Sequence, residues 1–205
     1  MGRKNWIILL AIVLVLCSWA VVRGYPRPSP SGRGWQLKFE YGQMHKVRLV
    51  LPGQTQVKTF WYMPYVVTNN TGRDISFYPR SYLLTDSNQL IESVQGVDAL
   101  AYPAIARLLG RELLEEELFV SGKLLQGEEY ARESVIIFRD FDPKAISFKV
   151  FISGLSNESA QVRNPMTRKK VSLVKTLQLG YGLSGDRHSS PEITAELKEK
   201  DWIMR

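Results

Sequence analysis

The residue types of a hydrolytic site gather in one short stretch of the chain. Asp186, His188, Ser189 and Ser190 supply a carboxylate, an imidazole and two hydroxyl groups, as a serine hydrolase triad would. Neighbours in one loop do not readily adopt triad geometry, which needs groups brought together from different elements. The only other histidine, His45, falls in an expected strand. We therefore interpret this stretch as a surface loop and predict no catalytic residue.

Two acidic motifs could bind a metal ion. Asp140 and Asp142 in the segment RDFDP have the alternate spacing of a calcium-binding fragment, but Pro143 and the strand that follows favour a simple turn. The acidic triplet 115–117 is better explained as a solvated face, because adjacent residues on a helix or strand do not converge on one ion. The sequence also lacks a glycine-rich phosphate loop or another cofactor signature. We predict no metal-ligating and no cofactor-binding residue.

An aromatic cluster offers a third kind of site. Trp35, Trp61, Tyr62 and Tyr65 lie close together in the sequence, and aromatic side chains on an exposed sheet can stack on sugars or anchor a partner. A domain without disulfides needs large aromatic residues inside, so we expect these residues in the core. A carbohydrate-binding module that uses Trp35 or Trp61 is the alternative.

The first 24 residues place the protein at a membrane. Arg3 and Lys4 precede an apolar or small-residue run from Trp6 to Val22, a length of 17 residues that lies between a signal-peptide core and a spanning helix. The positive-inside rule puts the basic start in the cytoplasm and the rest of the chain outside. We expect the apolar run to be retained as a membrane anchor, with the rest of the chain in the periplasm. The alternative is that the leader is cleaved and the rest of the chain is secreted. Residues 25–34 then form a linker rich in Pro, Ser and Gly.

The only cysteine, Cys17, lies inside this apolar leader. Leu16 precedes it, where a lipid-modified cysteine would follow a small residue, so we expect an inert apolar side chain. With one cysteine the chain can form no internal disulfide and no zinc site built from cysteine pairs. The fold must therefore rest on packing.

Residues 35–205 show the patterning of an all-β domain. Alternation of apolar and polar residues predicts strands, and Pro52-Gly53 and the Asn69-Asn70-Thr71-Gly72 segment predict turns. Pro64 predicts a bulge or an edge stretch within its strand. Good helix formers near 99–110, with Gly110 as a stop, predict one short helical insertion.

About nine strands and frequent turns favour an antiparallel immunoglobulin-like β-sandwich, with a tail that forms either a strand or a short helix. The expected strands lie at 35–41, 46–51, 59–69, 74–79, 81–86, 134–140, 146–155 and 171–183, and NPMTRKK is expected to be the hairpin loop between the last two.

Several of these motifs resemble one family. The segments VTNNTGRDISFYPRSYLLTDSN and LLQGEEYARESVIIFRDFDPKAISFKVFISGL are similar to exported bacterial immunoglobulin-like proteins of the telokin-like, DUF4352-type family. The chain departs from the family pattern after Asn88, where Gln89 stands in place of glycine. The resemblance implies an extracytoplasmic β-sandwich and implies no known activity. Because the family is bacterial, the resemblance also argues against glycosylation at the N-x-S/T triplets that begin at Asn69 and Asn157. The matching residues are Asn69, Asn70, Thr71, Leu84, Asp86, Asn88, Gly127, Glu128 and Phe138, with FRDFDP at 138–143 and WIMR at 202–205.

Composition narrows the range of functions. The 44% of hydrophobic residues is enough for a core, and the formal charge is +7. Five basic residues lie in the leader and linker, so the net charge of the folded part is only about +2. This is too little positive charge to predict binding to nucleic acid. We expect a membrane-anchored binding module or structural module of the cell envelope, with an unknown protein or envelope partner. The alternatives are a secreted carbohydrate-binding module and, less favoured, a metal-dependent or hydrolytic domain.

Overall fold

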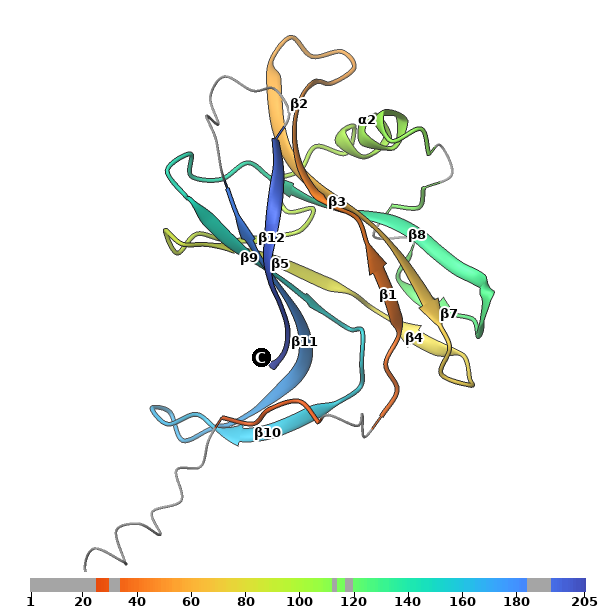
Figure 1. Cartoon of the computed structure of the whole chain (residues 1–205), viewed down its shortest axis with the longest axis vertical. Helices are drawn as coiled ribbons and strands as arrows, with labels where there is room; N and C mark the ends of the chain where they lie inside the picture. The colour runs from red at the N-terminus through yellow and green to blue at the C-terminus, as the bar shows by residue number, and fades with distance from the viewer. Residues whose placement is uncertain (1–24, 30–33, 112–113, 117–119, 184–192) are drawn as a thin grey trace, which may run out of the picture.

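The computed structural model describes residues 25–29, 34–111, 114–116, 120–183 and 193–205. The described part is mostly antiparallel β structure with one α-helix, which confirms the predicted all-β class (Figure 1). The predicted leader, residues 1–24, lies outside the described residues, and the described helix is too short to cross a bilayer. The elements are β1 (Lys38–Tyr41), β2 (Met44–Val50), β3 (Val57–Asn69), β4 (Ile75–Phe77), β5 (Arg80–Thr85), β6 (Leu90–Glu92), α2 (Ala101–Leu108), β7 (Gly122–Leu124), β8 (Gly127–Arg139), β9 (Ser147–Ser153), β10 (Ser159–Arg163), β11 (Lys170–Gly182) and β12 (Ile193–Met204).

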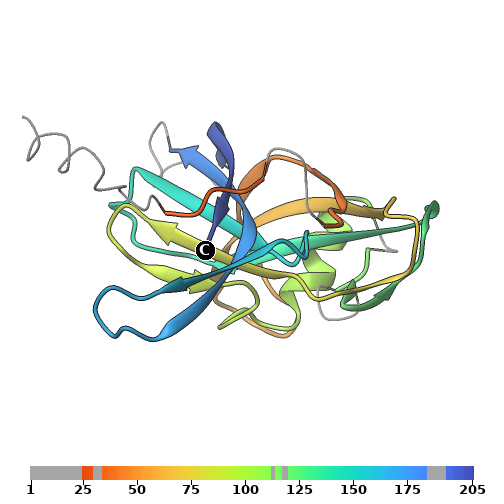
Figure 2. The same ribbon diagram turned by 90° about the horizontal axis from the view of Figure 1, so that it is seen from below.

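Ten of the strands form two layers that are joined along their edges, and β4 pairs with β7 in a separate two-stranded sheet (Figures 1 and 2). In one layer β3 pairs with β8 on one side and with both β2 and β1 on the other. In the second layer the order is β12, β11, β9, β5 and β6, and β10 pairs with the first part of β11. The first residues of β12 pair with β2 and the later ones with β11, so β12 belongs to both layers.

The layer built on β3 is buried on both faces. Trp61 and Met63 point into the core between the layers, whereas Phe60 and Tyr62 point to the opposite face. Helix α2 covers that opposite face and packs Ile105 against it (Figure 1). Strands buried on both faces need nearly continuous apolar runs, and this explains the FWYM segment of β3 and the VIIF segment of β8.

Helix α2 is fixed to the β2–β3 hairpin through Asp98. The Asp98 carboxylate accepts hydrogen bonds from the Gln54 amide and the Lys58 ammonium, each at 2.7 Å, and from the backbone N–H of Leu100. These donors, the Lys58 ammonium first, hold the pKa of Asp98 well below its usual range. Gly110 follows the helix with a φ of +65°, so the predicted stop is confirmed.

The predicted turn after β3 is built around a buried side chain. Asn69 is fully buried, and its amide nitrogen donates to the backbone carbonyls of Arg73 and Leu124 at 2.8 and 2.9 Å. Its amide oxygen accepts from the backbone N–H and the hydroxyl of Thr71. The Asn69 side chain therefore ties the turn to the strand β7, and its burial leaves no room for a glycan.

Some predicted elements differ from the structure. The loop NPMTRKK joins β10 to β11, because the unpredicted strand β10 lies between β9 and this loop. The short strands β6 and β7 are likewise unpredicted, and regular pairing in the first strand begins only at Lys38. The tail is the strand β12, not a helix. Pro64 lies in neither a bulge nor an edge stretch, because it pairs with Val135 of β8 on one side and its carbonyl accepts the backbone N–H of Gly42 on the other. Its missing amide hydrogen falls in the gap between β2 and β1, and the irregularity of β3 lies between Val67 and Asn69.

The segment before β1 lies against the second layer. The backbone N–H of Ser29 donates to the Glu158 carboxylate at 2.6 Å, and Glu158 forms an ion pair with Lys175 at 3.1 Å. Both charged side chains are at least nine-tenths buried, and the Lys175 ammonium also lies 5.3 Å from the centre of the Trp202 ring. Residues 25–29 and β12 line an open pocket of about 720 Å³ beside this pair.

Candidate functional site

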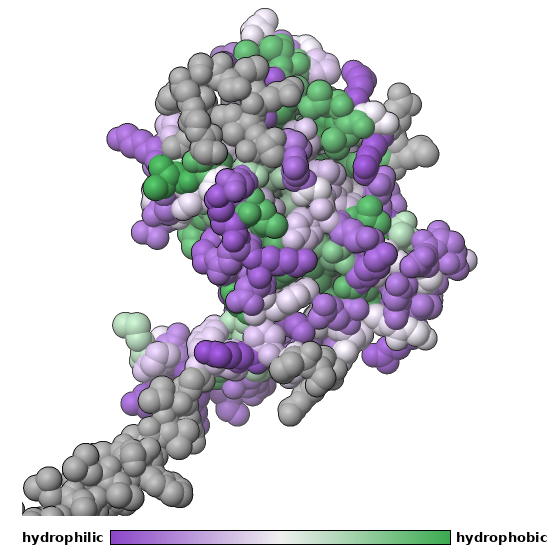
Figure 3. All heavy atoms as spheres, viewed as in Figure 1, coloured by the Kyte–Doolittle hydropathy of each residue, from purple (hydrophilic) through white to green (hydrophobic). Residues whose placement is uncertain are grey.

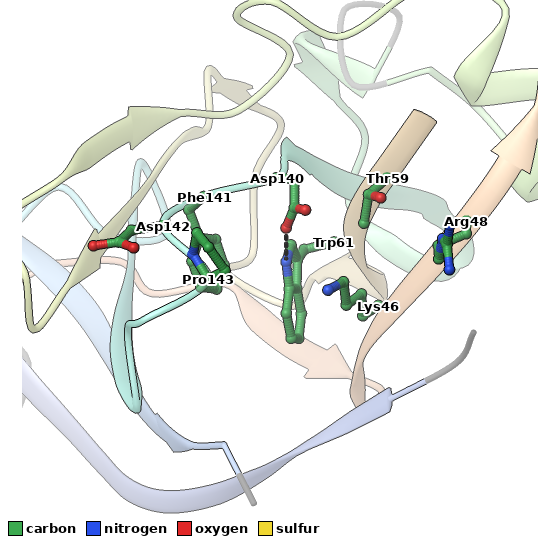
Figure 4. A pocket seen from close by; sticks show the side chains of 8 residues that line it. All are labelled: Lys46, Arg48, Thr59, Trp61, Asp140, Phe141, Asp142 and Pro143. Carbon is green, nitrogen blue, oxygen red and sulfur yellow. Dashed lines mark hydrogen bonds between the residues drawn. The ribbon is translucent and has the colours of Figure 1, made fainter. Parts of the chain in front are cut away.

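A polar pocket lies between the β2–β3 hairpin and the loop that follows β8 (Figure 4). Its volume is about 240 Å³. This is smaller than the sites that enclose whole cofactors or drug-sized ligands, so the pocket suits a single chemical group such as a side chain or a sugar acid. The lining residues are Lys46, Arg48, Thr59, Trp61, Asp140, Phe141, Asp142 and Pro143.

One wall of the pocket is cationic because of strand geometry. Lys46 and Arg48 are two residues apart on β2, so both side chains project from the same face. Their neighbours across the pair are Trp61 and Thr59 of β3, which project from the same face of the layer. Lys46 is half-buried, with its ammonium 5.8 Å from the centre of the Trp61 ring, and Arg48 is exposed. Within the described ranges neither cation takes part in an ion pair.

The floor of the pocket is held rigidly by aromatic packing. Trp61 is 1% exposed, with Phe141 stacked on it at a centroid distance of 5.0 Å and Phe148 edge-on at 5.5 Å. The indole N–H of Trp61 donates to a carboxylate oxygen of Asp140 at 3.0 Å (Figure 4). Asp140 is exposed, so its second oxygen can still accept a hydrogen bond from a ligand.

The aromatic cluster is a core feature for three of its four members. Trp61, Tyr62 and Tyr65 are buried, which confirms the expected core positions. Because packing covers the ring of Trp61, that residue cannot act as a stacking platform for a sugar. Trp35 is half-buried and packs against the main core.

The structure does not bring Asp140 and Asp142 together. In Figure 4 the Asp140 carboxylate faces Trp61, whereas the Asp142 carboxylate lies at the far side of Phe141 and points elsewhere. Asp142 accepts the backbone N–H of Lys144 at 2.9 Å, so it closes the turn that the sequence predicts. In the described part of the chain no cluster of three or more His, Cys, Asp or Glu side chains could share a metal ion.

The other predicted residues lie away from the pocket. His45 projects from the opposite face of β2 and stacks on Tyr62 at 5.5 Å. Asp186, His188, Ser189 and Ser190 lie outside the described residues. The acidic triplet is only partly a solvated face, since Glu116 is exposed but Glu115 is half-buried and pairs with Arg132 at 3.3 Å. Glu117 lies outside the described residues.

Sequence reasoning missed the two cations of the pocket. The signal was the alternation K-V-R within β2, which places Lys46 and Arg48 on the face opposite the buried Val47. This alternation predicts a shared face, but only the fold shows that the loop after β8 closes over it.

The arrangement can bind an anionic group. An ammonium and a guanidinium on one wall suit a carboxylate or phosphate, and Asp140 on the other side can accept from a neighbouring hydroxyl or amine. The described lining contains no histidine, cysteine or serine that could act as a base or nucleophile pair.

No protein-family model, curated protein or solved structure matches this chain. The resemblance to exported bacterial immunoglobulin-like domains stays a prediction.

Proposed function

We propose that this protein is a non-catalytic binding module that is held at a membrane by residues 1–24 and presents its β domain on the extracytoplasmic side. The basic start and the long apolar run of the leader support the tether and its orientation. The linker that follows supports a folded body outside the bilayer. We also propose that the two packed layers form an immunoglobulin-like sandwich.

The observation that carries the binding role is the pairing of Lys46 and Arg48 over a rigid aromatic floor. The fold keeps these two cations together in a pocket without an ion-pair partner among the described residues. The ligand is a small anionic group that also carries a hydrogen-bond donor for Asp140. A sugar acid has both features, because its hydroxyl groups donate beside its carboxylate.

A fluorescence titration tests the pocket. Glucuronate supplies a carboxylate beside hydroxyl groups, phosphate supplies charge alone, and glucose supplies hydroxyl groups alone. Because Lys46 lies over Trp61, occupancy should change the tryptophan emission. We expect glucuronate to bind most tightly, phosphate more weakly and glucose not at all. Equal responses to glucuronate and glucose would contradict an anionic ligand.

Matched substitutions locate the binding. Lys46→Met keeps the aliphatic stem and removes the charge, and we expect it to weaken glucuronate binding about 10-fold or more, since a charge-assisted hydrogen bond is worth about 1.5–3 kcal/mol. Lys200→Met is the control, because Lys200 also lies over an aromatic ring, that of Tyr41 at 5.1 Å, but outside this pocket. Unchanged binding in Lys46→Met and Arg48→Met would rule the pocket out.

The tether has an independent test in intact cells. We expect the full-length protein in the membrane fraction, with its body cleaved by protease added from the outer side only. Recovery of the full-length protein in the cytosol would refute the membrane part of the proposal.

A further inference from the structure

The β10–β11 hairpin carries an unusual concentration of positive charge. Arg163, Arg168, Lys169 and Lys170 lie at its tip, all four are exposed, and none of them forms an ion pair within the described part of the chain. No acidic residue occurs from 159 to 185, so nothing nearby in the sequence offsets this charge.

An apolar side chain protrudes from the middle of this basic tip. Met166 is 91% exposed, the highest value among the large apolar residues described as exposed. In Figure 3 a weakly hydrophobic group stands out from hydrophilic surroundings at the lower left, where Figure 1 places the hairpin tip. The turn is held in shape because the Asn164 side chain accepts the backbone N–H groups of Met166 and Thr167 at 2.9 and 3.0 Å.

The hairpin begins where the leader's linker attaches to the body. Glu158, which directly precedes β10, accepts the hydrogen bond from Ser29. Five residues separate the end of the leader from that contact, a span of at most about 17 Å. The five residues of β10 extend about 17 Å from the same point, so the tip can reach the level at which the leader ends.

We propose that the β10–β11 hairpin docks on an anionic phospholipid surface, with Arg163, Arg168, Lys169 and Lys170 at the headgroups and Met166 inserted between them. Clustered basic residues beside a membrane segment attract anionic lipids, and an apolar side chain among them adds burial at the interface. The inference rests on the proposed tether. It adds a second contact that fixes how the body stands on the membrane.

The arrangement gives the body a defined orientation. The β2–β3 hairpin, which forms part of the pocket, lies at the opposite end of the long axis from the β10–β11 hairpin (Figure 1). Docking of the β10–β11 hairpin therefore holds the β2–β3 hairpin at the end of the body that is far from the bilayer.

The test uses the full-length chain in lipid nanodiscs. A spin label is placed at residue 167 through Thr167→Cys in a Cys17→Ala background, which leaves Met166 in place. Its accessibility to oxygen, which concentrates in lipid, is compared with its accessibility to a water-soluble nickel chelate. The control label replaces the exposed Gln56 in the turn between β2 and β3.

In discs rich in phosphatidylglycerol we expect lipid-like accessibility at 167 and aqueous accessibility at 56. In phosphatidylcholine discs both labels should be aqueous. Neutralising Arg168, Lys169 and Lys170 to Gln should lower the docked-to-undocked ratio about 100-fold, or about fivefold for each charge. Met166→Ser should lower it by a smaller factor.

An aqueous label at 167 in both kinds of disc would overturn the inference while the chain stays disc-bound. It would leave the tether intact and point to an acidic protein as the partner of the hairpin. A chain that does not associate with discs at all would overturn the tether and the docking together.

Discussion

The buried ion pair between Glu158 and Lys175 gives the sharpest stability prediction. Breaking a buried pair by removing one partner costs about 3–5 kcal/mol, because the remaining charge stays out of water. Lys175→Met leaves Glu158 with the Ser29 N–H at 2.6 Å, so that carboxylate is not fully orphaned. We therefore expect Lys175→Met to lower the free energy of unfolding by about 3 kcal/mol, the lower end of this range. The measurement is urea unfolding of the full-length chain in mild detergent, followed by circular dichroism.

A double-mutant cycle isolates the pair. Glu158→Gln alone should cost about 2 kcal/mol, since the amide still accepts from Ser29 but leaves Lys175 without its counter-charge. The double variant should lose less than the sum of the two single losses, by about 2 kcal/mol. Lys149→Met is the matched control, because the Lys149–Glu199 pair has the same 3.1 Å separation but is about half-exposed, and it should cost less than about 1 kcal/mol. Additive losses, or a Lys175→Met loss no larger than that of the control, would refute the reasoning.

The same pair predicts a direction of pH dependence. The Ser29 N–H, followed by Lys175, holds the pKa of Glu158 below its ordinary value of 4.5. A carboxyl whose pKa is lower in the folded state stabilises the fold above its ordinary pKa, and this contribution disappears as the pH falls through the folded value. The stability difference between the wild type and Glu158→Gln should therefore be largest at neutral pH and shrink below about pH 4.5.

Three further outcomes follow from packing and hydrogen bonding. Asn69→Asp places a carboxylate against the carbonyls that now accept from the amide, and urea unfolding should show a loss of about 3 kcal/mol. Trp61→Phe removes the hydrogen bond to Asp140 and leaves a void beside Phe141, so urea unfolding should show a loss of about 2 kcal/mol. The same variant should bind glucuronate more weakly, which isothermal titration calorimetry measures without relying on the fluorescence of Trp61. Asp98→Asn should lower the urea midpoint at neutral pH but change it little in strong acid, because the donors around Asp98 stabilise only its charged form.

The sequence predicts the β class well because turn chemistry and apolar alternation are local properties. The Asn69 turn and the stop at Gly110 appear where their residue types predict them. The strand β10 was missed because its segment, SAQVR, is short and half-exposed, with no strong apolar alternation. Its pairing is decided by β11, which lies beyond the turn.

The candidate site was less predictable because it depends on contacts between distant segments. Asp140 is visible in the sequence as half of an acidic motif, but its partner is the Trp61 indole, 79 residues away, rather than Asp142. Lys46 and Arg48 look like ordinary exposed residues of an alternating strand. Only the loop after β8 turns their shared face into a pocket.

The position of β3 has a consequence for amide hydrogen exchange. β3 is hydrogen-bonded on both edges and covered on both faces, so its central amides are shielded unless the whole domain opens. Their exchange should report the free energy of global unfolding. The amides of β10, which among the described strands pairs with β11 alone, should exchange through smaller local openings. The chain thus contains its own internal reference for separating global from local stability.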